Sequence, residues 1–339
     1  MSLIIDMHIH IASKERPDCK ISNAMLSLPA FAYMVVANGI NPLDLAQHFD
    51  QTIRDHILGA LNASTTVKKG VLLALDAVYS EDGRRLEEKS HLIVSNDFVR
   101  ELAATHAKVL FGASVHPNRG HKAGLDEINR CFQGDPRAVL FKWIPNSQVI
   151  DPSDRRHTWF YERLAELGVP LLCHTGPEYA IPLPDPQGDH QRLGDPRKLR
   201  LALDVGVTVI VAHAATRFFP FEPYHYLDEL AAMMQEADRN KQWKLYADIS
   251  AMCVLCRVGT VGQVLEKIPP HRMVLGSDYP VPVNDMPPVL VGNLTFEEYL
   301  EILRIKNPIE KNYRQLLAMG FPASAGTKAA ELLPPWALG

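Results

Sequence analysis

The run Leu3-Ile4-Ile5-Asp6-Met7-His8-Ile9-His10 is apolar and β-forming, and it ends on two histidines separated by one residue. Alternate side chains of a strand point to the same face, so His8 and His10 are expected on one face, about 6.5–7 Å apart along the chain. Two imidazole nitrogens at that spacing can converge on one metal ion. The run therefore predicts a first strand that ends in a pair of metal ligands.

Seven more apolar runs have strand character, and segments with helical periodicity lie between and after them. The predicted strands are Gly70–Ala77, Val109–Val115, Ala138–Ile144, Pro170–Cys173, Val207–Ala212, Leu245–Ile249 and Met273–Gly276. The predicted helices are Leu43–Leu61, Lys89–His106, Ala123–Cys131, Arg155–Leu167, Pro196–Val205, Tyr226–Asn240, Val258–Ile268, Phe296–Ile305 and Pro308–Met319. Parallel strands need crossover helices, and eight such units close a barrel. The sequence predicts an α/β protein with a (β/α)8 TIM barrel; a doubly wound sheet in two domains is the alternative.

The chain is expected to form a single domain over residues 1–339, with the barrel over about 1–320 and a surface tail over 321–339. Asp195-Pro196 is typical of a helix start, and Gly168 and Gly206 are typical of helix ends. The long strand-to-helix loops are 11–41, 175–195 and 214–225. They are expected at one end of the barrel, and loops of this length are usually functional.

Composition excludes several function classes. The 339 residues include 35 basic and 39 acidic side chains, a net charge of −4, and 47% of them are hydrophobic, which indicates a folded globular chain. Without a basic face, the chain is not expected to bind nucleic acid. Five cysteines, among them an isolated Cys253-x-x-Cys256, form neither a disulfide framework nor a recognisable zinc motif. With no basic segment or signal peptide at the start, a cytoplasmic location is expected.

One uncharged apolar segment, Ile21 to Leu43, is broken by several polar residues and a proline. A membrane span needs about 20 predominantly apolar residues, so no membrane contact is expected. Exposed apolar surface of this extent is rare in monomers. The segment is therefore expected to form a lid over the barrel mouth or to lie in a homo-oligomer interface.

Polar side chains follow four further strands at their carboxyl ends: Lys142, His174, His213 and Asp278. That end carries the catalytic site in (β/α)8 barrels. Taken singly, Asp278 can cap a turn and Lys142 can reach solvent. Taken together, four imidazoles and a carboxylate at one end of a barrel would be unfavourable without a cation to hold them. The set predicts a metal-dependent active site.

The ordered set His8-x-His10, Lys142, His174, His213 and Asp278 resembles the amidohydrolase superfamily. Gly276-Ser-Asp-Tyr-Pro280 and Asn307-Pro-Ile-Glu-Lys-Asn-Tyr-Arg314 are similar, more narrowly, to the amidohydrolase-related family, which includes aminocarboxymuconate semialdehyde decarboxylase and related metal-dependent hydrolases. The resemblance implies that His8, His10, His174 and Asp278 bind one divalent ion, most often zinc. It implies that His213 holds the attacking water or the substrate, or binds a second ion.

The chemistry of the residues agrees with that assignment. Three nitrogens and one oxygen suit Zn²⁺, which leaves a position for water and lowers its pKa to roughly 7. Asp278 can take the proton and pass it on, and His213 can polarise the carbonyl or orient the nucleophile. Relatives with two metal ions carry a carbamylated lysine at the position of Lys142. Here an ammonium that clamps a substrate carboxylate is preferred, which leaves one ion per chain, with two as the alternative.

The sequence thus predicts a metal-dependent hydrolase in which activated water attacks an amide, lactone or similar carbonyl of a small carboxylic acid derivative. The alternative is a carbon–carbon lyase, a decarboxylase on the same scaffold, and a non-catalytic barrel is a third reading. Either enzyme needs cations for an acidic small-molecule substrate. Arg119 and Arg217 are the predicted substrate-binding arginines, together with Lys142, and Arg192 lies in another candidate loop.

Overall fold

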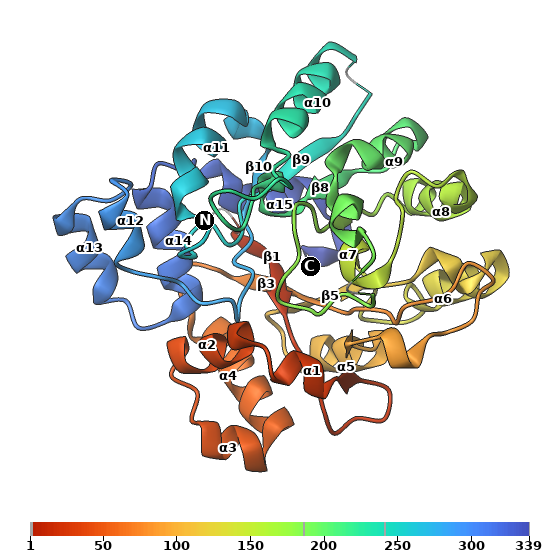
Figure 1. Cartoon of the computed structure of the whole chain (residues 1–339), viewed down its shortest axis with the longest axis horizontal. Coiled ribbons are helices and arrows are strands. Elements are labelled where there is room, and N and C mark those ends of the chain that lie inside the picture. Colours follow the sequence, from red (N-terminus) through yellow and green to blue (C-terminus); the bar gives the residue numbers. More distant parts are fainter. Residues whose placement is uncertain (1–2, 186, 241, 339) are drawn as a thin grey trace.

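The eight predicted strands form one parallel sheet that curls into a nearly closed barrel (Figure 1). The computed structural model describes residues 3–185, 187–240 and 242–338. Around the barrel the strands are β1 (Ile5–His10), β3 (Lys69–Leu73), β5 (Val109–Ala113), β6 (Leu140–Trp143), β7 (Leu171–Cys173), β8 (Val209–Val211), β9 (Leu245–Asp248) and β10 (Met273–Val274). Each predicted run overlaps an observed strand, so the predicted (β/α)8 fold is confirmed.

β1 and β10 are the first and last strands of the sheet, and backbone hydrogen bonds outside the regular strand pairing join them to close the barrel. The amide of Met7 donates to the carbonyl of Leu275 at 3.0 Å, and the amide of Asp278 donates to the carbonyl of His8 at 2.8 Å. Asp278 has a φ of +65°, a left-handed conformation that turns the chain sharply just after β10. The closure of the barrel therefore holds the carboxylate of Asp278 beside the end of β1.

Helices surround the barrel on its outer side (Figure 1). The outer ring contains α4 (Phe49–Ala63), α5 (Asn96–Thr105), α6 (His121–Arg130), α8 (Thr158–Leu167), α9 (Arg200–Val205), α10 (Leu227–Asn240), α11 (Val261–Lys267) and α14 (Pro308–Ala318). The remaining helices are α1 (Asn23–Leu26), α2 (Pro29–Ala37), α3 (Pro42–Gln47), α7 (Pro145–Gln148), α12 (Pro287–Leu290), α13 (Phe296–Leu303) and α15 (Ser324–Leu332). Gly168 and Gly206 end α8 and α9 in the left-handed conformation, as their positions predict.

The predicted helix over Lys89–His106 is wrong in its first half. A short strand, β4 (Leu92–Ile93), pairs antiparallel with β2 (Lys20–Ile21) in a separate two-stranded sheet. Helix α5 begins only after Ser95, whose side chain accepts a hydrogen bond from the amide of Phe98. This N-cap satisfies a backbone donor at the helix start, so the helix begins there.

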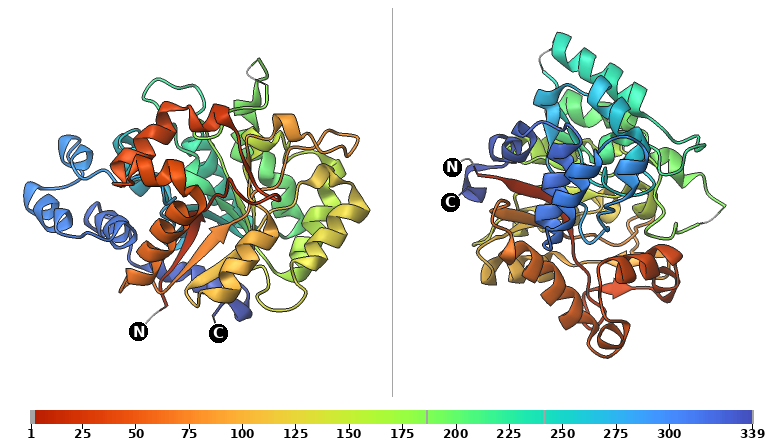
Figure 2. Two further views of the ribbon diagram at one scale, coloured as in Figure 1. Left: turned by 90° about the horizontal axis from the view of Figure 1, so that it is seen from below. Right: turned by 90° about the vertical axis from the view of Figure 1, so that its left-hand side faces the viewer.

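Within the segment expected as a surface tail, 321–339, the described residues include a helix that packs on the barrel instead. Helix α15 contacts β1 and β10, and the amide of Leu275 donates to the carbonyl of Ala325 at 3.0 Å. Ala329 and Leu333 are buried in a cluster with apolar side chains of the barrel strands. Figure 2 shows α15 at the end of the barrel opposite to α2. The segment covers apolar side chains that solvent would otherwise reach, which the local sequence does not reveal.

No helix in the described part of the chain is long and apolar enough to cross a membrane.

Candidate active site

Three of the predicted ligands meet where β1 and β10 end. His8 and His10 come from β1, and Asp278 follows β10. The Nε2 atoms of His8 and His10 lie 3.1 Å apart, and Oδ1 of Asp278 lies 3.3 Å from the first and 3.1 Å from the second. His8 and Asp278 are buried, while the side chain of His10 is 28% exposed. We call these three residues the ligand triad.

Asp248 and Ser250 support the triad from the end of β9. Nδ1 of His8 lies 2.6 Å from Oδ2 of Asp248, which also accepts a hydrogen bond from the Ser250 hydroxyl at 2.9 Å. A carboxylate on Nδ1 keeps the proton on that nitrogen, so Nε2 of His8 presents a lone pair to the triad. Burial holds the pKa of His8 well below its ordinary value, which keeps the ring neutral.

The triad fits a divalent cation. Ligand atoms of a tetrahedral site with bonds of about 2.0–2.1 Å lie about 3.3 Å from each other. The three triad separations, 3.1, 3.1 and 3.3 Å, match that spacing. Within the described residues, these three are the His, Cys, Asp and Glu side chains whose ligand atoms all lie within 4.8 Å of each other. The hydrogen bond from His8 to Asp248 is the support that a metal-binding histidine usually has.

Lys142 lies on β6, fully buried, with its Nζ 3.0 Å from Nε2 of His8. Burial lowers the pKa of Lys142, and the charges of Asp278 and Asp248 oppose that shift. Neither carboxylate reaches ion-pair distance of Lys142 in the part of the chain that the structure describes. Lys142 therefore forms an ion pair with neither carboxylate, and a substrate carboxylate stays its predicted partner.

His213 follows β8, and its ring stacks on that of His8 with centroids 5.4 Å apart. Its Nδ1 lies 2.8 Å from the hydroxyl of Ser250 and 3.4 Å from the carbonyl of Ser250. A carbonyl only accepts hydrogen bonds, and the Ser250 hydroxyl donates to Asp248, so Nδ1 of His213 carries the proton. Nε2 of His213 is then an acceptor, and it has no partner among the described residues. Burial lowers the pKa of His213 well below its ordinary value, which keeps the ring neutral.

His174 follows β7 and lies beside His213, with ring centroids 5.0 Å apart. Its Nε2 contacts the carbonyl of Pro177 at 3.2 Å and Oε2 of Glu178 at 3.5 Å. The structure thus brings His8, His10 and Asp278 into one group but does not bring His174 into it. His174 as a fourth ligand stays a prediction, with Nδ1 as the nitrogen that carries the lone pair.

The predicted substrate-binding arginines lie around the barrel mouth. Arg119 forms a two-point ion pair with Asp76, with Nε to Oδ2 at 2.5 Å and Nη2 to Oδ1 at 2.7 Å. Arg217 is half-buried, and its backbone amide donates to Nδ1 of His225 at 3.1 Å. Neither contact tests a role in substrate binding, so both assignments stay predictions.

Besides Asp248, three buried polar groups of this site are not among the residues predicted from the sequence. Glu178 accepts hydrogen bonds from the amides of Ala180 and Ile181 and is buried against His174. Ser250 connects His213 to Asp248, and Arg257 is buried in the loop after β9. The position of Ser250 just beyond a strand end is a signal that could have found it. The sequence around Arg257 offers no such signal.

The loops after β7 and β8 are joined to each other. The ring of Tyr179 contacts those of Phe218 and Phe219, with centroids 5.7 and 5.4 Å apart. The Tyr179 hydroxyl donates to Glu222, which also accepts the amide of Phe218 at 3.1 Å. We call these four residues the loop clasp. It holds together the two loops that follow His174 and His213.

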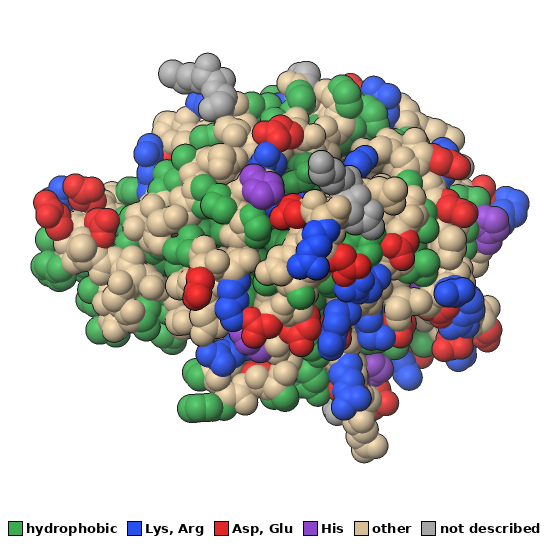
Figure 3. All heavy atoms as spheres, turned by 90° about the horizontal axis from the view of Figure 1, so that it is seen from above, with side chains coloured by type: hydrophobic (Ala, Val, Ile, Leu, Met, Phe, Trp, Pro, Cys, Tyr) green, Lys and Arg blue, Asp and Glu red, His purple; other side chains and the backbone are tan. Residues whose placement is uncertain are grey.

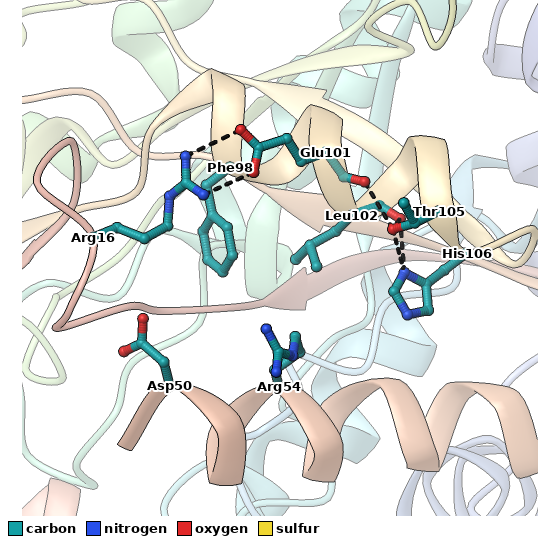
Figure 4. A pocket seen from close by; sticks show the side chains of 8 residues that line it. All are labelled: Arg16, Asp50, Arg54, Phe98, Glu101, Leu102, Thr105 and His106. Carbon is teal, nitrogen blue, oxygen red and sulfur yellow. Dashed lines mark hydrogen bonds and ion pairs between the residues drawn. The ribbon is translucent and has the colours of Figure 1, made fainter. Parts of the chain in front are cut away.

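Two surface pockets lie away from the triad. One, of about 570 Å³, lies between α4 and α5 and is lined by Arg16, Asp50, Arg54, Phe98, Glu101, Leu102, Thr105 and His106 (Figure 4). In it Arg16 pairs with Glu101, and Phe98 and Leu102 form the apolar wall. The other, of about 430 Å³, lies between loops at the barrel mouth and includes Tyr79 and His157. Neither is lined by a ligand-triad residue.

Comparisons with known proteins agree with this geometry. The family model described as amidohydrolase matches residues 5–302. An uncharacterized TIM-barrel protein from Bordetella bronchiseptica has a similar structure, with 17% identity, 93% of this chain and 98% of that chain covered, and a TM-score of 0.56. Comparison of the sequence with curated proteins finds no significant match.

Two other similar structures carry functional names. A putative 2-pyrone-4,6-dicarboxylic acid hydrolase from Pseudomonas putida has 16% identity, coverage of 99% and 96%, and a TM-score of 0.53. A 5-carboxyvanillate decarboxylase from Novosphingobium aromaticivorans, complexed with manganese, has 15% identity, coverage of 96% and 93%, and a TM-score of 0.54. At these identities the likeness shows a shared fold.

Proposed function

Because the chain belongs to the amidohydrolase family, we propose that it is a metal-dependent hydrolase that cleaves an amide, lactone or similar carbonyl bond of a small carboxylic acid derivative. The observation that carries this proposal is the ligand triad, in which His8, His10 and Asp278 present two nitrogens and one oxygen within 3.3 Å of each other. A divalent cation held there, zinc or a similar ion, supplies Lewis acidity toward a carbonyl oxygen and activates water at neutral pH.

Asp278 and His213 have different roles in the proposed reaction. Oδ1 of Asp278 faces both triad histidines, while its Oδ2 has no hydrogen-bond partner in the described residues. That oxygen is free to take a proton from the nucleophile and return it to the leaving group. His213 offers an unpartnered acceptor at Nε2, so it can orient the attacking water by accepting a hydrogen bond. Polarising a carbonyl, the other role predicted for His213, would need a proton on that nitrogen.

Elemental analysis tests the metal site directly. We expect about one divalent ion per chain, which His10→Ala removes without unfolding the barrel, because His10 is the most exposed member of the triad. The control is His271→Ala, since the His271 side chain is 65% exposed and lies outside the site. Full metal content in His10→Ala would contradict the assignment. Two divalent ions per unaltered chain would favour the alternative site with two metal ions.

Product analysis tests the reaction. Metal-loaded protein is offered 2-pyrone-4,6-dicarboxylate as a lactone probe and 5-carboxyvanillate as a decarboxylation probe, with His10→Ala as the inactive control. Ring opening with proton release and no carbon dioxide supports a hydrolase. Carbon dioxide from the second probe, without ring opening of the first, would replace the proposal by the lyase alternative. Turnover of neither probe would contradict the proposed substrate class.

The chain is also proposed to form a homo-oligomer through the α2–α12 surface, which comprises Tyr33, Val36, Met286, Leu290 and Val291. Helix α2 carries no charged residue, and the Tyr33 hydroxyl accepts a hydrogen bond from Asn284, just before α12. Val36 is 73% exposed and Leu290 is 77% exposed. Figure 3 shows hydrophobic side chains next to a group of acidic ones at the left, where α12 and α13 extend from the barrel in Figure 1. Apolar surface of this kind usually marks an interface; a monomer in sizing chromatography would contradict the assembly.

We propose a cytoplasmic location because the cysteines of the chain are free thiols. All five cysteines are free, and four of them are buried. Free thiols in this number are typical of proteins from a reducing compartment. Fractionation of cells that express the chain tests the location.

A further inference from the structure

Arg257 is a buried arginine without an acidic partner. It lies in the loop after β9, directly after Cys256, and is 3% exposed. No carboxylate oxygen lies within 4.0 Å of its nitrogens among residues 3–185, 187–240 and 242–338. Burial lowers its pKa, whereas arginines with an acidic partner keep a strongly basic guanidinium. A buried, unpaired charge is unfavourable in a folded protein, so its presence needs an explanation.

Only one nitrogen of the Arg257 guanidinium, Nη1, is held by hydrogen bonds. Nη1 donates to the carbonyl of Thr216 at 2.6 Å and to the hydroxyl of Thr216 at 2.9 Å. The group also lies over the ring of Phe218, 5.5 Å from its centroid. Nε and Nη2 form no hydrogen bond within the described part of the chain. These two nitrogens share one edge of the planar group, and their N–H bonds point the same way.

Other arginines of this chain use that same edge to bind a carboxylate. Arg119 binds both oxygens of Asp76 through Nε and Nη2. Arg16 binds both oxygens of Asp18 in the same way, at 2.9 and 3.0 Å. Two parallel N–H···O bonds match the spacing of carboxylate oxygens and are stronger than neutral hydrogen bonds. Arg257 presents this arrangement with the carboxylate missing.

Arg257 lies close to the histidines that follow β7 and β8. Thr216, which holds it, lies three residues beyond His213, and the charge of Arg257 acts on both His213 and His174. Asp278 and Glu178 are the acidic groups whose charges act most strongly on Arg257 in turn, from beyond ion-pair distance. Arg257 is therefore placed beside His174 and His213, at the same end of the barrel as the ligand triad.

We propose that Arg257 binds a carboxylate of the substrate through Nε and Nη2 and thereby selects carboxylate-bearing substrates. The inference rests on the proposed function in taking this end of the barrel as the substrate site. The bound carboxylate supplies the partner that the protein lacks, and Thr216 keeps the guanidinium plane in place for it. The substrate class is then a small acid with one carboxylate at Arg257 and its reacting carbonyl at the triad.

The test uses an unreactive probe, so that binding is measured without turnover. Calorimetry and thermal melting compare isophthalate (benzene-1,3-dicarboxylate) with its neutral dimethyl ester, using metal-loaded protein and the Arg257→Gln and Arg257→Lys variants. The control is Arg54→Gln, because Arg54 is exposed in the pocket of Figure 4. Arg257→Lys keeps a donor for Thr216 and guards against misfolding of Arg257→Gln.

Isophthalate is expected to bind the unaltered protein and Arg54→Gln equally and to raise their melting temperatures. Affinity should fall by about 10- to 100-fold in Arg257→Gln and by a smaller factor in Arg257→Lys, because the ammonium lacks the two-point geometry. Binding of the diester should not depend on Arg257. Equal isophthalate affinity in all variants, no binding to any of them, or binding of inorganic phosphate in its place would overturn the proposal. The two proposals fail separately. Carbon dioxide release in the product analysis would contradict the hydrolase proposal but would not change the isophthalate affinities that test Arg257.

Discussion

Nδ1 of His8 lies 2.6 Å from Oδ2 of Asp248, although 240 residues separate the two in sequence. The pair joins the first strand of the barrel to the seventh. It decides which nitrogen of His8 faces the triad, because the proton stays on the side of the carboxylate. The chemistry of the ligand triad therefore depends on a residue that is not a member of it.

Asp248→Asn is expected to weaken metal binding without removing any ligand. The amide can donate to Nδ1, which moves the His8 proton to Nε2 and blocks the lone pair there. Loss of such a supporting residue typically lowers metal affinity by about 10- to 100-fold. A metal titration against a chelating dye measures the change, with Asp228→Asn on the surface of α10 as the control. Unchanged affinity in Asp248→Asn would mean that His8 does not bind through Nε2.

Asp278→Asn is expected to lower kcat much more than it raises KM. The amide oxygen keeps a contact with the triad, but the side chain no longer accepts a proton from the nucleophile. Removal of a general base typically costs about 10²–10⁴ in rate. Steady-state kinetics at saturating metal measures the effect, with Asp55→Asn, an exposed residue of α4, as the control. Wild-type kcat in Asp278→Asn would transfer the base role to His213, whose Nε2 is the next free acceptor.

Lys142→Ala distinguishes an ammonium from a carbamate. As an ammonium, Lys142 is expected to bind a substrate carboxylate, so its loss should raise KM by about 10- to 100-fold with metal content unchanged. As a carbamate it would carry negative charge and bridge two ions, and its loss would remove metal. Kinetics and elemental analysis of the same preparation separate the two. Loss of a metal equivalent would contradict the ammonium.

His116, which lies outside the ligand triad, is expected to make the free energy of unfolding depend on pH. Its Nε2 donates to the carbonyl of Gln148 at 2.9 Å, and its Nδ1 accepts the amide of Asn118 at 3.1 Å. The bond that Nδ1 accepts needs a neutral ring, and burial lowers the pKa of His116 to about 4. The unfolded chain takes up the proton near pH 6.5, so this stabilisation is complete above that pH and is lost as the pH falls toward 4.

The free energy of unfolding should therefore fall by up to about 3 kcal/mol on account of His116 between pH 6.5 and pH 4. Denaturant unfolding of His116→Gln across this range should show a shallower dependence on pH than the unaltered protein. His271→Gln should leave the dependence unchanged, since His271 is exposed. Identical slopes for His116→Gln and the unaltered chain would contradict the assignment.

The sequence is informative where local pattern and chemistry coincide. Apolar runs that end on His8, His10 and Asp278 predict both the barrel and the triad, because the carboxyl ends of parallel strands meet at one end. The packing of α15 against the barrel was not predictable, since an Ala- and Pro-rich segment shows no strong amphipathic pattern. The unpaired edge of Arg257 was not predictable either, because the absence of a partner is a property of the packed chain. The two-point ion pair of Arg119 with Asp76 could not be predicted from the sequence for the same reason.

The loop clasp of Tyr179, Phe218, Phe219 and Glu222 has a kinetic consequence. Because the clasp joins the two loops that follow His174 and His213, we expect ligand entry to require these loops to separate. Association is then expected to be slower than diffusion allows and to level off at the opening rate as ligand concentration rises. Tyr179→Ala should speed ligand entry and exit by similar factors in stopped-flow experiments and leave Kd nearly unchanged. The clasp would thus set how long a bound molecule stays, independently of how tightly the site holds it.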